Sequence, residues 1–240
     1  MKGASEPTRK VYDQPYVRTL FDAIAPRYDF LNHFLSLGID ILWRRRAIRL
    51  LEPYKPQRIL DVATGTGDLA IEAARLQPKQ IVGIDISQKM IDIGKEKIRA
   101  KNLESVISFE IGNAEQLTYE SNSFDAITVA FGVRNFSDLR KGLSEFYRVL
   151  HRGGVAIILE FSRPRHSPIA RAYGLYSRYI LPRIGGFVSR KRAAYEYLPN
   201  TIAEFPDGPE FCGILRDAGF SDVQHFQQTF GIATLYRATK

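Results

Sequence analysis

The chain has 240 residues but only one cysteine, Cys212, and no apolar run near the roughly 20 residues that would cross a bilayer. A single cysteine excludes an internal disulfide framework and favours a reducing compartment. The four histidines show no metal-ligand spacing, so we predict no metal. The polar N-terminus, residues 1–14, has no apolar core of a signal peptide. We therefore expect a flexible lead-in to a cytoplasmic protein.

Acidic residues are missing from one long stretch. Between Phe161 and Tyr195 there is no Asp or Glu, although this stretch carries eight Lys and Arg residues. Because the net charge of the chain is +8, the excess of positive charge belongs to this segment. Its interleaved tyrosines and arginines fit either a membrane-facing surface or a helical cover with outward arginines. For a second basic run, residues 44–46, we expect a solvated face, with phosphate or lipid contacts as the alternative.

The clearest motif in the chain is a buried strand, a glycine-rich turn and a helix start, which together form the sequence RILDVATGTGDLA at residues 58–70. The aliphatic residues of this run suit a fully covered parallel strand. Gly65 and Gly67 are expected to let the backbone approach a ligand closely, where a Cβ would clash. The same spacing satisfies the dinucleotide fingerprint, so the motif admits NAD or another adenosine cofactor.

Two acidic residues help to separate these cofactors. Asp68 stands at the helix start, where a dinucleotide would place its pyrophosphate, and a carboxylate there would repel that group. S-adenosylmethionine has no phosphate, and Asp61 at the strand end would attract its sulfonium and ammonium groups. A simple helix-start carboxylate is an equal alternative for Asp68. The motif therefore favours S-adenosylmethionine without deciding the matter.

Strands and helices alternate regularly along most of the chain, which indicates a parallel, doubly wound α/β sheet. Residues 14–51 are expected to form helices around a break at Gly38. The predicted strands cover 58–63, 80–86, 105–111, 124–131 and 154–161. Helices are predicted near 67–76, 88–101, 138–150 and 208–218. Two further β runs, 222–228 and 231–238, are predicted to close the chain as an antiparallel hairpin.

Ligands of such sheets bind beyond the carboxyl ends of the strands, where the strand order reverses. Asp85 ends the second predicted strand, and a carboxylate there can accept hydrogen bonds from both ribose hydroxyls of either cofactor. A solvated Asp at the strand end is the alternative. Asn113 and Ala114 follow the third strand, where an amide and a small residue can edge an adenine. A turn-forming Asn is the alternative. This predicted adenosine site has no phosphate contact.

Several stretches resemble the C-methyltransferases of menaquinone and ubiquinone biosynthesis. Residues 28–32 (YDFLN) and 36–44 (SLGIDILWR) are similar to the first family signature, and 148–154 (RVLHRGG) with 159–162 (LEFS) are similar to the second. With FGVRN at 131–135, the resemblance covers nearly the whole chain. It implies a class I, Rossmann-like methyltransferase with seven strands, which uses S-adenosylmethionine to methylate a carbon of a polyprenylated quinol.

The resemblance also implies how the chain is organised. We expect an N-terminal helical cap over 1–56 and a methyltransferase domain over 57–240, with a basic helical insert over about 163–205. The expected cofactor site consists of Asp61, Gly65, Thr66, Gly67, Asp85, Asn113 and Ala114. Of these, Thr66, Asp85, Asn113 and Ala114 match the family's cofactor contacts.

The expected catalytic residues lie on two parts of the chain. Arg134, just beyond the fourth strand, is the first candidate to stabilise the oxyanion of an ionising quinol, and Asn135 is expected to orient the same oxygen. On the cap, Tyr28, Asp29 and Asn32 are expected to cover the site, with Asp29 as a proton acceptor. The alternatives are a surface salt bridge for Arg134 and plain helix packing for Tyr28.

The chain departs from the family pattern at a few positions. These are Leu31 in place of Met, Asp40 in place of His, Ala130 in place of a Ser found in some members, and His151-Arg152 in place of Lys-Pro. None removes a motif, although the change at Asp40 argues against a catalytic role there. The VATGTG version of the cofactor loop favours demethylmenaquinol over the benzoquinol of ubiquinone biosynthesis.

Other functions are less favoured. A nucleic-acid methyltransferase fits the charge, but the fourth strand is not followed by an Asn/Asp-Pro-Pro-aromatic motif and Cys212 lies outside the loops, so we expect no nucleic-acid partner. An NAD oxidoreductase is less favoured because Asp68 would repel its pyrophosphate, and a non-catalytic scaffold that binds S-adenosylmethionine stays open. We expect a polyprenyl quinol as substrate and a transient contact with the inner face of the membrane, with a homodimer as one candidate assembly.

Overall fold

The computed structural model describes residues 13–164 and 192–240. Its centre is a seven-stranded sheet in the order β3-β2-β1-β4-β5-β7-β6, in which β7 is antiparallel to both neighbours. The strands are β1 (Arg58–Val62), β2 (Gln80–Asp85), β3 (Ile107–Ile111), β4 (Phe124–Ala130), β5 (Leu150–Phe161), β6 (Ser221–Gln228) and β7 (Ala233–Thr239). The predicted α/β class, the parallel central strands and the closing hairpin are confirmed.

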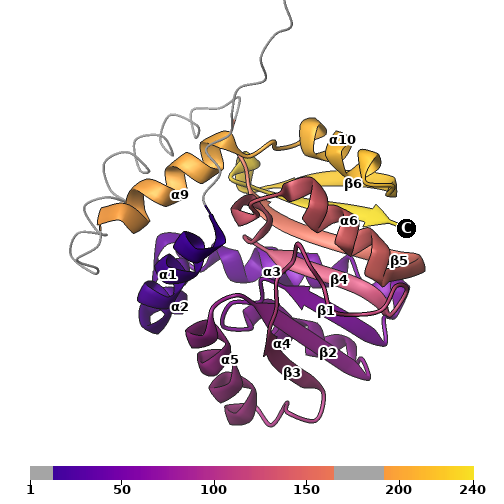
Figure 1. Cartoon of the computed structure of the whole chain (residues 1–240), viewed down its shortest axis with the longest axis horizontal. Helices are drawn as coiled ribbons and strands as arrows, with labels where there is room; N and C mark the ends of the chain where they lie inside the picture. Colours follow the sequence, from indigo (N-terminus) through magenta and orange to yellow (C-terminus); the bar gives the residue numbers. More distant parts are fainter. Residues whose placement is uncertain (1–12, 165–191) are drawn as a thin grey trace, which may run out of the picture.

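Helices cover both faces of this sheet (Figure 1). One face carries α3 (Ile39–Arg49), α4 (Asp68–Ala73) and α5 (Gln88–Ala100), and the other carries α6 (Leu139–Val149) and α10 (Pro209–Asp217). Successive side chains of a strand point to opposite faces. On β5, Ile157 and Leu159 therefore pack in the buried cluster on the side of α3, α4 and α5, while Ile158 packs in the cluster on the side of α6 and α10.

Three more helices, α1 (Gln14–Ile24), α2 (Tyr28–Leu35) and α9 (Arg192–Glu204), lie at one end of the sheet (Figure 1). This is the end where the parallel strands finish, and Val17 and Leu20 of α1 are buried there against Tyr197 of α9. A single 3-10 turn over Ala25–Arg27 joins α1 to α2. These cap helices close over the edge of the sheet at which the sequence predicts ligand binding.

The structure moves some of the expected boundaries. Gln14 does not belong to a flexible lead-in, because it begins α1 and the Asp13 carboxylate caps this helix by accepting the Tyr16 N–H at 3.0 Å. β5 begins at Leu150 rather than at 154. Helix α9 is the described part of the basic insert, and residues 165–191 of that insert lie outside the described residues. Within the described ranges, no helix has both the length and the apolarity to cross a bilayer.

Candidate active site

The end of β1 presents a buried carboxylate. Asp61 is 1% exposed, and the hydroxyls of Thr64 and Thr128 each donate a hydrogen bond of 2.6 Å to it. Burial raises the pKa of Asp61 from 3.8 to about 6, although these two hydrogen bonds act in the opposite direction. A buried carboxylate of this kind is stabilised by a positive charge placed beside it. Asp61 therefore fits the cationic end of a ligand such as S-adenosylmethionine.

The two glycines of the turn have different surroundings. Both adopt left-handed backbone angles, with φ +57° at Gly65 and φ +86° at Gly67. A Cβ on Gly67 would lie 2.4 Å from the ring of Phe109, whereas a Cβ on Gly65 would come no closer than 3.7 Å to Tyr28. Gly67 is thus required by its packing against Phe109, so only Gly65 presents an open backbone to a ligand. At Gly67, where the sequence suggested the close approach of a ligand, the close neighbour in the structure is the Phe109 ring.

A carboxylate at the end of β2 faces the same turn. One oxygen of Asp85 accepts the Gly65 N–H at 2.9 Å, and the other accepts the Ser87 N–H at 2.9 Å. Burial raises the pKa of Asp85 to about 6, even though these backbone hydrogen bonds favour the charged form. The two carboxylates predicted at the strand ends therefore flank Gly65 from both sides.

Asn113 and Ala114 line a pocket of about 70 Å³ together with Asp85 and Gly65. The Asn113 amide exchanges two hydrogen bonds with Gln14 of α1, at 3.1 and 3.2 Å. Gln14 also lines this pocket. Sequence reasoning missed Gln14 because a glutamine in a polar terminus carries no signal until α1 is known to lie over the strand ends.

A smaller recess of about 20 Å³ continues this site on the other side of Gly65. It is lined by Asp61, Thr66 and Asp68, and it shares Tyr28, Ala63, Gly65 and Ala130 with the first pocket. We call the pocket and the recess together the donor pocket. Its two parts place Asp85 and Asn113 at one end and Asp61 at the other, which suits an elongated ligand with a cationic end.

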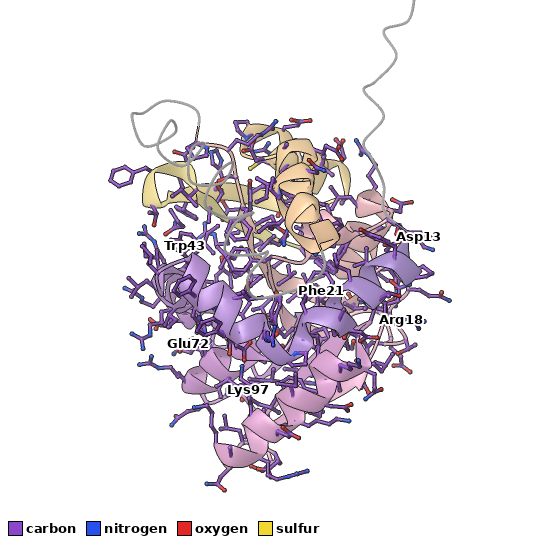
Figure 2. The ribbon with its side chains drawn as sticks, turned by 90° about the vertical axis from the view of Figure 1, so that its left-hand side faces the viewer. Asp13, Arg18, Phe21, Trp43, Glu72 and Lys97 are labelled. Carbon is purple, nitrogen blue, oxygen red and sulfur yellow. The ribbon has the colours of Figure 1, made fainter. Side chains whose placement is uncertain are left out.

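An ion-pair network ties the cap to the donor pocket. The Thr66 hydroxyl donates to the carboxylate of Asp29, and Lys97 binds Asp29 at 2.8 Å. Lys97 also pairs with Asp68, which begins α4 as expected for a helix-start carboxylate. Figure 2 shows Lys97 below Phe21. Asp29 lines neither the first pocket nor the larger one described next, so its carboxylate holds α2 to the turn.

A second pocket, of about 300 Å³, lies between the cap and the sheet, and we call it the acceptor pocket. Its apolar wall consists of Leu20, Phe21, Ile24, Leu31, Leu37, Ile39, Trp43, Phe131, Phe161, Leu198, Pro199 and Ile232. Phe21, Tyr28 and Phe131 line both this pocket and the donor pocket. A ligand in one pocket would therefore meet a ligand in the other at these three rings.

Arg134 is the main cation of the acceptor pocket. It is 6% exposed, and its guanidinium lies 2.7 Å from the carboxylate of Glu160, which is fully buried. The same guanidinium donates to the Phe131 carbonyl. The alternative of a surface salt bridge is therefore wrong, because this pair is buried at the wall of a cavity. Glu160 was not singled out in the sequence.

The other expected catalytic residues are divided between the pockets. Asn32 lines the acceptor pocket, and Asn135 lines the donor pocket, where its amide oxygen accepts the Tyr197 hydroxyl at 2.8 Å. Tyr28 lines both, and burial raises its pKa above 10.0, although Asn32 acts to lower it. The Tyr28 hydroxyl therefore keeps its proton near neutral pH and is available to donate a hydrogen bond.

Asp40 also lines the acceptor pocket, but its charge is already satisfied. It accepts hydrogen bonds from Ser36 and Arg44, and His33 lies 2.9 Å away. Burial acts to raise the pKa of Asp40, yet Ser36 and Arg44 hold it below 3.8, which makes this carboxylate a poor proton acceptor. Arg44 is 7% exposed, so its expected place on a solvated face is wrong.

The strand order, the glycine turn and the two carboxylates that flank it define a class I S-adenosylmethionine-dependent methyltransferase. A solved structure of such a methyltransferase from Thermotoga maritima shares this fold, with a TM-score of 0.66 over 92% of this chain and 99% of that one, at 21% identity.

The chain belongs to the ubiE/COQ5 methyltransferase family, whose family model matches residues 9–240. It is 52% identical to the demethylmenaquinone methyltransferase of Bacteroides fragilis over 225 aligned residues. The alignment covers 93% of this chain and 92% of the relative. It is also 46% identical to the ubiquinone/menaquinone biosynthesis C-methyltransferase UbiE of Geobacter sulfurreducens over 226 aligned residues. This alignment covers 93% of this chain and 88% of the relative. The expected family, enzyme class and cofactor are confirmed.

Proposed function

We propose that this protein transfers the methyl group of S-adenosylmethionine to a ring carbon of demethylmenaquinol, as a step of menaquinone biosynthesis. The observation that carries the proposal is the contact between the donor pocket and the apolar acceptor pocket at Phe21, Tyr28 and Phe131. The relative that is 52% identical is named a demethylmenaquinone methyltransferase, which supports a naphthoquinol over a benzoquinol.

The donor pocket has the groups that S-adenosylmethionine needs. The buried Asp61 would hold the cationic end of the cofactor. Asp85 would accept hydrogen bonds from the ribose hydroxyls, while its hydrogen bonds from the Gly65 and Ser87 N–H groups fix the turn. Asn113 and Ala114 would edge the adenine, with Gln14 orienting the amide of Asn113. When bound, the cofactor supplies an electrophilic methyl group. Asp61 and Asp85 would keep it in one pose at the shared wall.

The acceptor pocket has to stabilise a negative oxygen next to the reacting carbon, since the ring carbon becomes nucleophilic as its neighbouring hydroxyl loses a proton to solvent. Arg134 is placed for this role, because Glu160 fixes the position of its guanidinium at the wall of the pocket. Tyr28 and Asn32 would orient the ring from the cap. Fixed donors of this kind lower a barrier substantially because they need no rearrangement in the transition state.

Asp29 and Asn135 have less direct places in this proposal. The carboxylate of Asp29 is bound by Thr66 and Lys97, so we propose that it positions α2 over the turn rather than accepting a proton. Asn135 joins the end of β4 to α9 through Tyr197. It would hold the shared wall of the two pockets in place.

The substrate also suggests where the protein works. A polyprenyl quinol is held in a bilayer, so we propose a transient, peripheral contact with the inner face of the membrane. The described residues of one chain line both pockets, and we keep the homodimer as one candidate assembly.

Purified protein tests the proposal directly. With labelled S-adenosylmethionine and a short-tailed demethylmenaquinol, mass spectrometry should show a methyl group on the naphthoquinol ring, and the matching benzoquinol should react more slowly. A strain that lacks the gene should accumulate demethylmenaquinone. Methylation of the benzoquinol alone would overturn the choice of substrate, and tight cofactor binding without turnover of either quinol would favour a scaffold.

A further inference from the structure

The corner between α2 and α3 exposes an unusual number of large apolar side chains. Their exposed fractions are 60% for Phe30, 47% for Phe34, 83% for Leu37, 39% for Ile41 and 56% for Leu42. The rings of Phe30 and Phe34 stack on each other with their centroids 5.6 Å apart. Single exposed apolar residues need no explanation, but a contiguous group of this size marks an interaction surface.

Within residues 30–51, which form this corner, exposed positive charge is not matched by exposed negative charge. Arg45, Arg46 and Arg49 are exposed on α3. Between Phe30 and Leu51 the only acidic residue is Asp40, which is buried and paired with Arg44. With a rise of about 1.5 Å per residue, Arg45 and Arg49 follow Ile41 along the helix axis at about 6 and 12 Å. The exposed face of α3 is thus apolar at its beginning and cationic further along.

The same corner is part of the acceptor pocket. Ser36, Leu37 and Ile39 line that pocket, and Leu37 is also the most exposed of the apolar residues named above. The surface and the pocket are therefore continuous through Leu37. A ligand that enters the pocket past Leu37 would therefore come from the environment that contacts the corner, either water or a membrane.

We propose that the α2–α3 corner, made of Phe30, Phe34, Leu37, Ile41 and Leu42 with Arg45, Arg46 and Arg49, inserts into the surface of an anionic bilayer. This inference rests on the proposed function, since it gives the quinol a route into the acceptor pocket. Apolar side chains at the tip and arginines about one and two helical turns behind them match the acyl and headgroup layers of such a membrane. A second copy of the chain, docked by the same surface, would place these arginines against the same arginines of its partner, where their like charges would repel.

The proposal therefore assigns Arg45 and Arg46 to a membrane contact, in place of the solvated face that the sequence led us to expect.

Vesicle binding tests this membrane contact with two triple variants that remove the same number of positive charges. R45Q/R46Q/R49Q removes the cations of the corner, and K55Q/K79Q/R152Q removes three exposed cations near the amino ends of β1, β2 and β5, at the opposite edge of the sheet.

On vesicles of phosphatidylcholine with phosphatidylglycerol, we expect the first variant to bind on the order of 100-fold more weakly than the wild type, because each arginine at a membrane surface is worth roughly fivefold. The second variant should bind almost like the wild type. Equal losses for both variants would show a general charge effect and overturn the proposal. The absence of wild-type binding to these vesicles would overturn it as well.

The apolar tip has its own variant, F34Q/L42Q, at two exposed positions that do not line the acceptor pocket. It should keep the melting temperature and the activity on a short-tailed quinol in solution, but it should lose vesicle binding and turnover of quinol held in vesicles. Unchanged turnover in vesicles would contradict the proposal. A wild-type dimer in sedimentation that F34Q/L42Q dissolves would assign the corner to a second copy instead.

The activity on the short-tailed quinol separates the two proposals. If the wild type does not methylate this quinol, the proposed function fails, whatever the vesicles show. If it does so while the R45Q/R46Q/R49Q protein binds vesicles as tightly as the wild type, only the membrane corner fails.

Discussion

The donor and acceptor pockets meet at three aromatic rings, yet they are built in different ways. The donor pocket is an edge of the sheet, where Asp61 and Asp85 end adjacent parallel strands and flank Gly65. The acceptor pocket is a space between α1, α2, α3, α9 and the turn before β7, and its wall is mostly apolar. Cofactor binding is therefore a property of the sheet, whereas the acceptor is selected by the cap.

The largest effect that separates the two pockets is expected at Arg134. The Arg134→Ala change should lower the single-turnover rate of methyl transfer by about 10²–10³-fold, because it removes the donor to the developing oxyanion. It should leave the dissociation constant of S-adenosylmethionine unchanged, as measured by calorimetry. The change also leaves Glu160 buried without its cation, which costs about 3–5 kcal/mol of unfolding free energy.

A second variant separates the lost chemistry from the lost stability. Arg134→Ala combined with Glu160→Gln should regain most of the unfolding free energy while turnover stays low. Turnover near that of the wild type in either protein would show that Arg134 has no part in the reaction.

The opposite pattern is expected at Asp61. Asp61→Asn keeps the shape of the side chain and removes its charge, so the affinity for S-adenosylmethionine should fall about 100-fold. The affinity for a quinol analogue, followed by quenching of Trp43 fluorescence, should stay the same, and the ligand-free protein should melt no lower than the wild type. Unchanged cofactor affinity would place the cationic end of the ligand elsewhere.

The raised pKa values of Asp61 and Asp85 predict opposite pH responses of binding and stability. Both rise from 3.8 to about 6, so the stability associated with their neutral forms is full below about 3.8 and is lost as the pH increases through about 6. Cofactor affinity should instead increase over pH 5–7 as the carboxylates ionise. Titration calorimetry over this range checks the slope, which Asp61→Asn should flatten. A flat wild-type profile would be evidence against these two pKa shifts.

A packing test asks whether the glycine turn serves the cofactor or the fold. Gly67→Ala should cost about 1–3 kcal/mol in a denaturant titration, because the new Cβ meets the Phe109 ring and the backbone is left-handed. Gly65→Ala should cost less stability, since its Cβ has no close neighbour, and it should lose more cofactor affinity. Equal effects on both measurements would remove the distinction between the two glycines.

The smallest effect concerns the wall of the acceptor pocket. The Trp43 ring donates a hydrogen bond of 2.8 Å to the hydroxyl of Thr229, which joins α3 to the turn before β7. Thr229→Val should cost about 1 kcal/mol of stability and raise the KM for the quinol a fewfold, with no change in cofactor affinity. Thr229→Ser, which keeps the hydroxyl, is the matched control. A weaker cofactor affinity in Thr229→Val would link the two pockets more closely than we expect.

The sheet and the donor pocket were largely predictable from the sequence, and the acceptor pocket was not. Strand alternation locates Asp61 and Asp85 because the carboxyl ends of parallel strands share one edge. The partner of Arg134 needs the register of β4 against β5, which places Ala130 beside Leu159 and so brings Glu160 to the end of β4. No local pattern carries that information.

Arg44 shows a signal that was present in the sequence but misread. The buried residues of α3 are Asp40, Trp43, Arg44, Ala47 and Ile48, which follow the spacing of one helical face. Arg44 therefore lies on the buried face, while Arg45 and Arg46 lie on the exposed one. Three consecutive arginines suggested a common solvated face, but helical periodicity places them on different sides.

The contact between the two pockets can be measured most directly with one molecule that fills both. A bisubstrate analogue, in which a naphthoquinol ring is joined to the sulfur of S-adenosylhomocysteine through one methylene group, should bind at least 100-fold more tightly than S-adenosylhomocysteine alone, since the linked parts bind as one molecule. Asp61→Asn and Arg134→Ala should each weaken its binding. An analogue that binds no more tightly than S-adenosylhomocysteine, and is insensitive to Arg134→Ala, would show that donor and acceptor do not meet at Phe21, Tyr28 and Phe131.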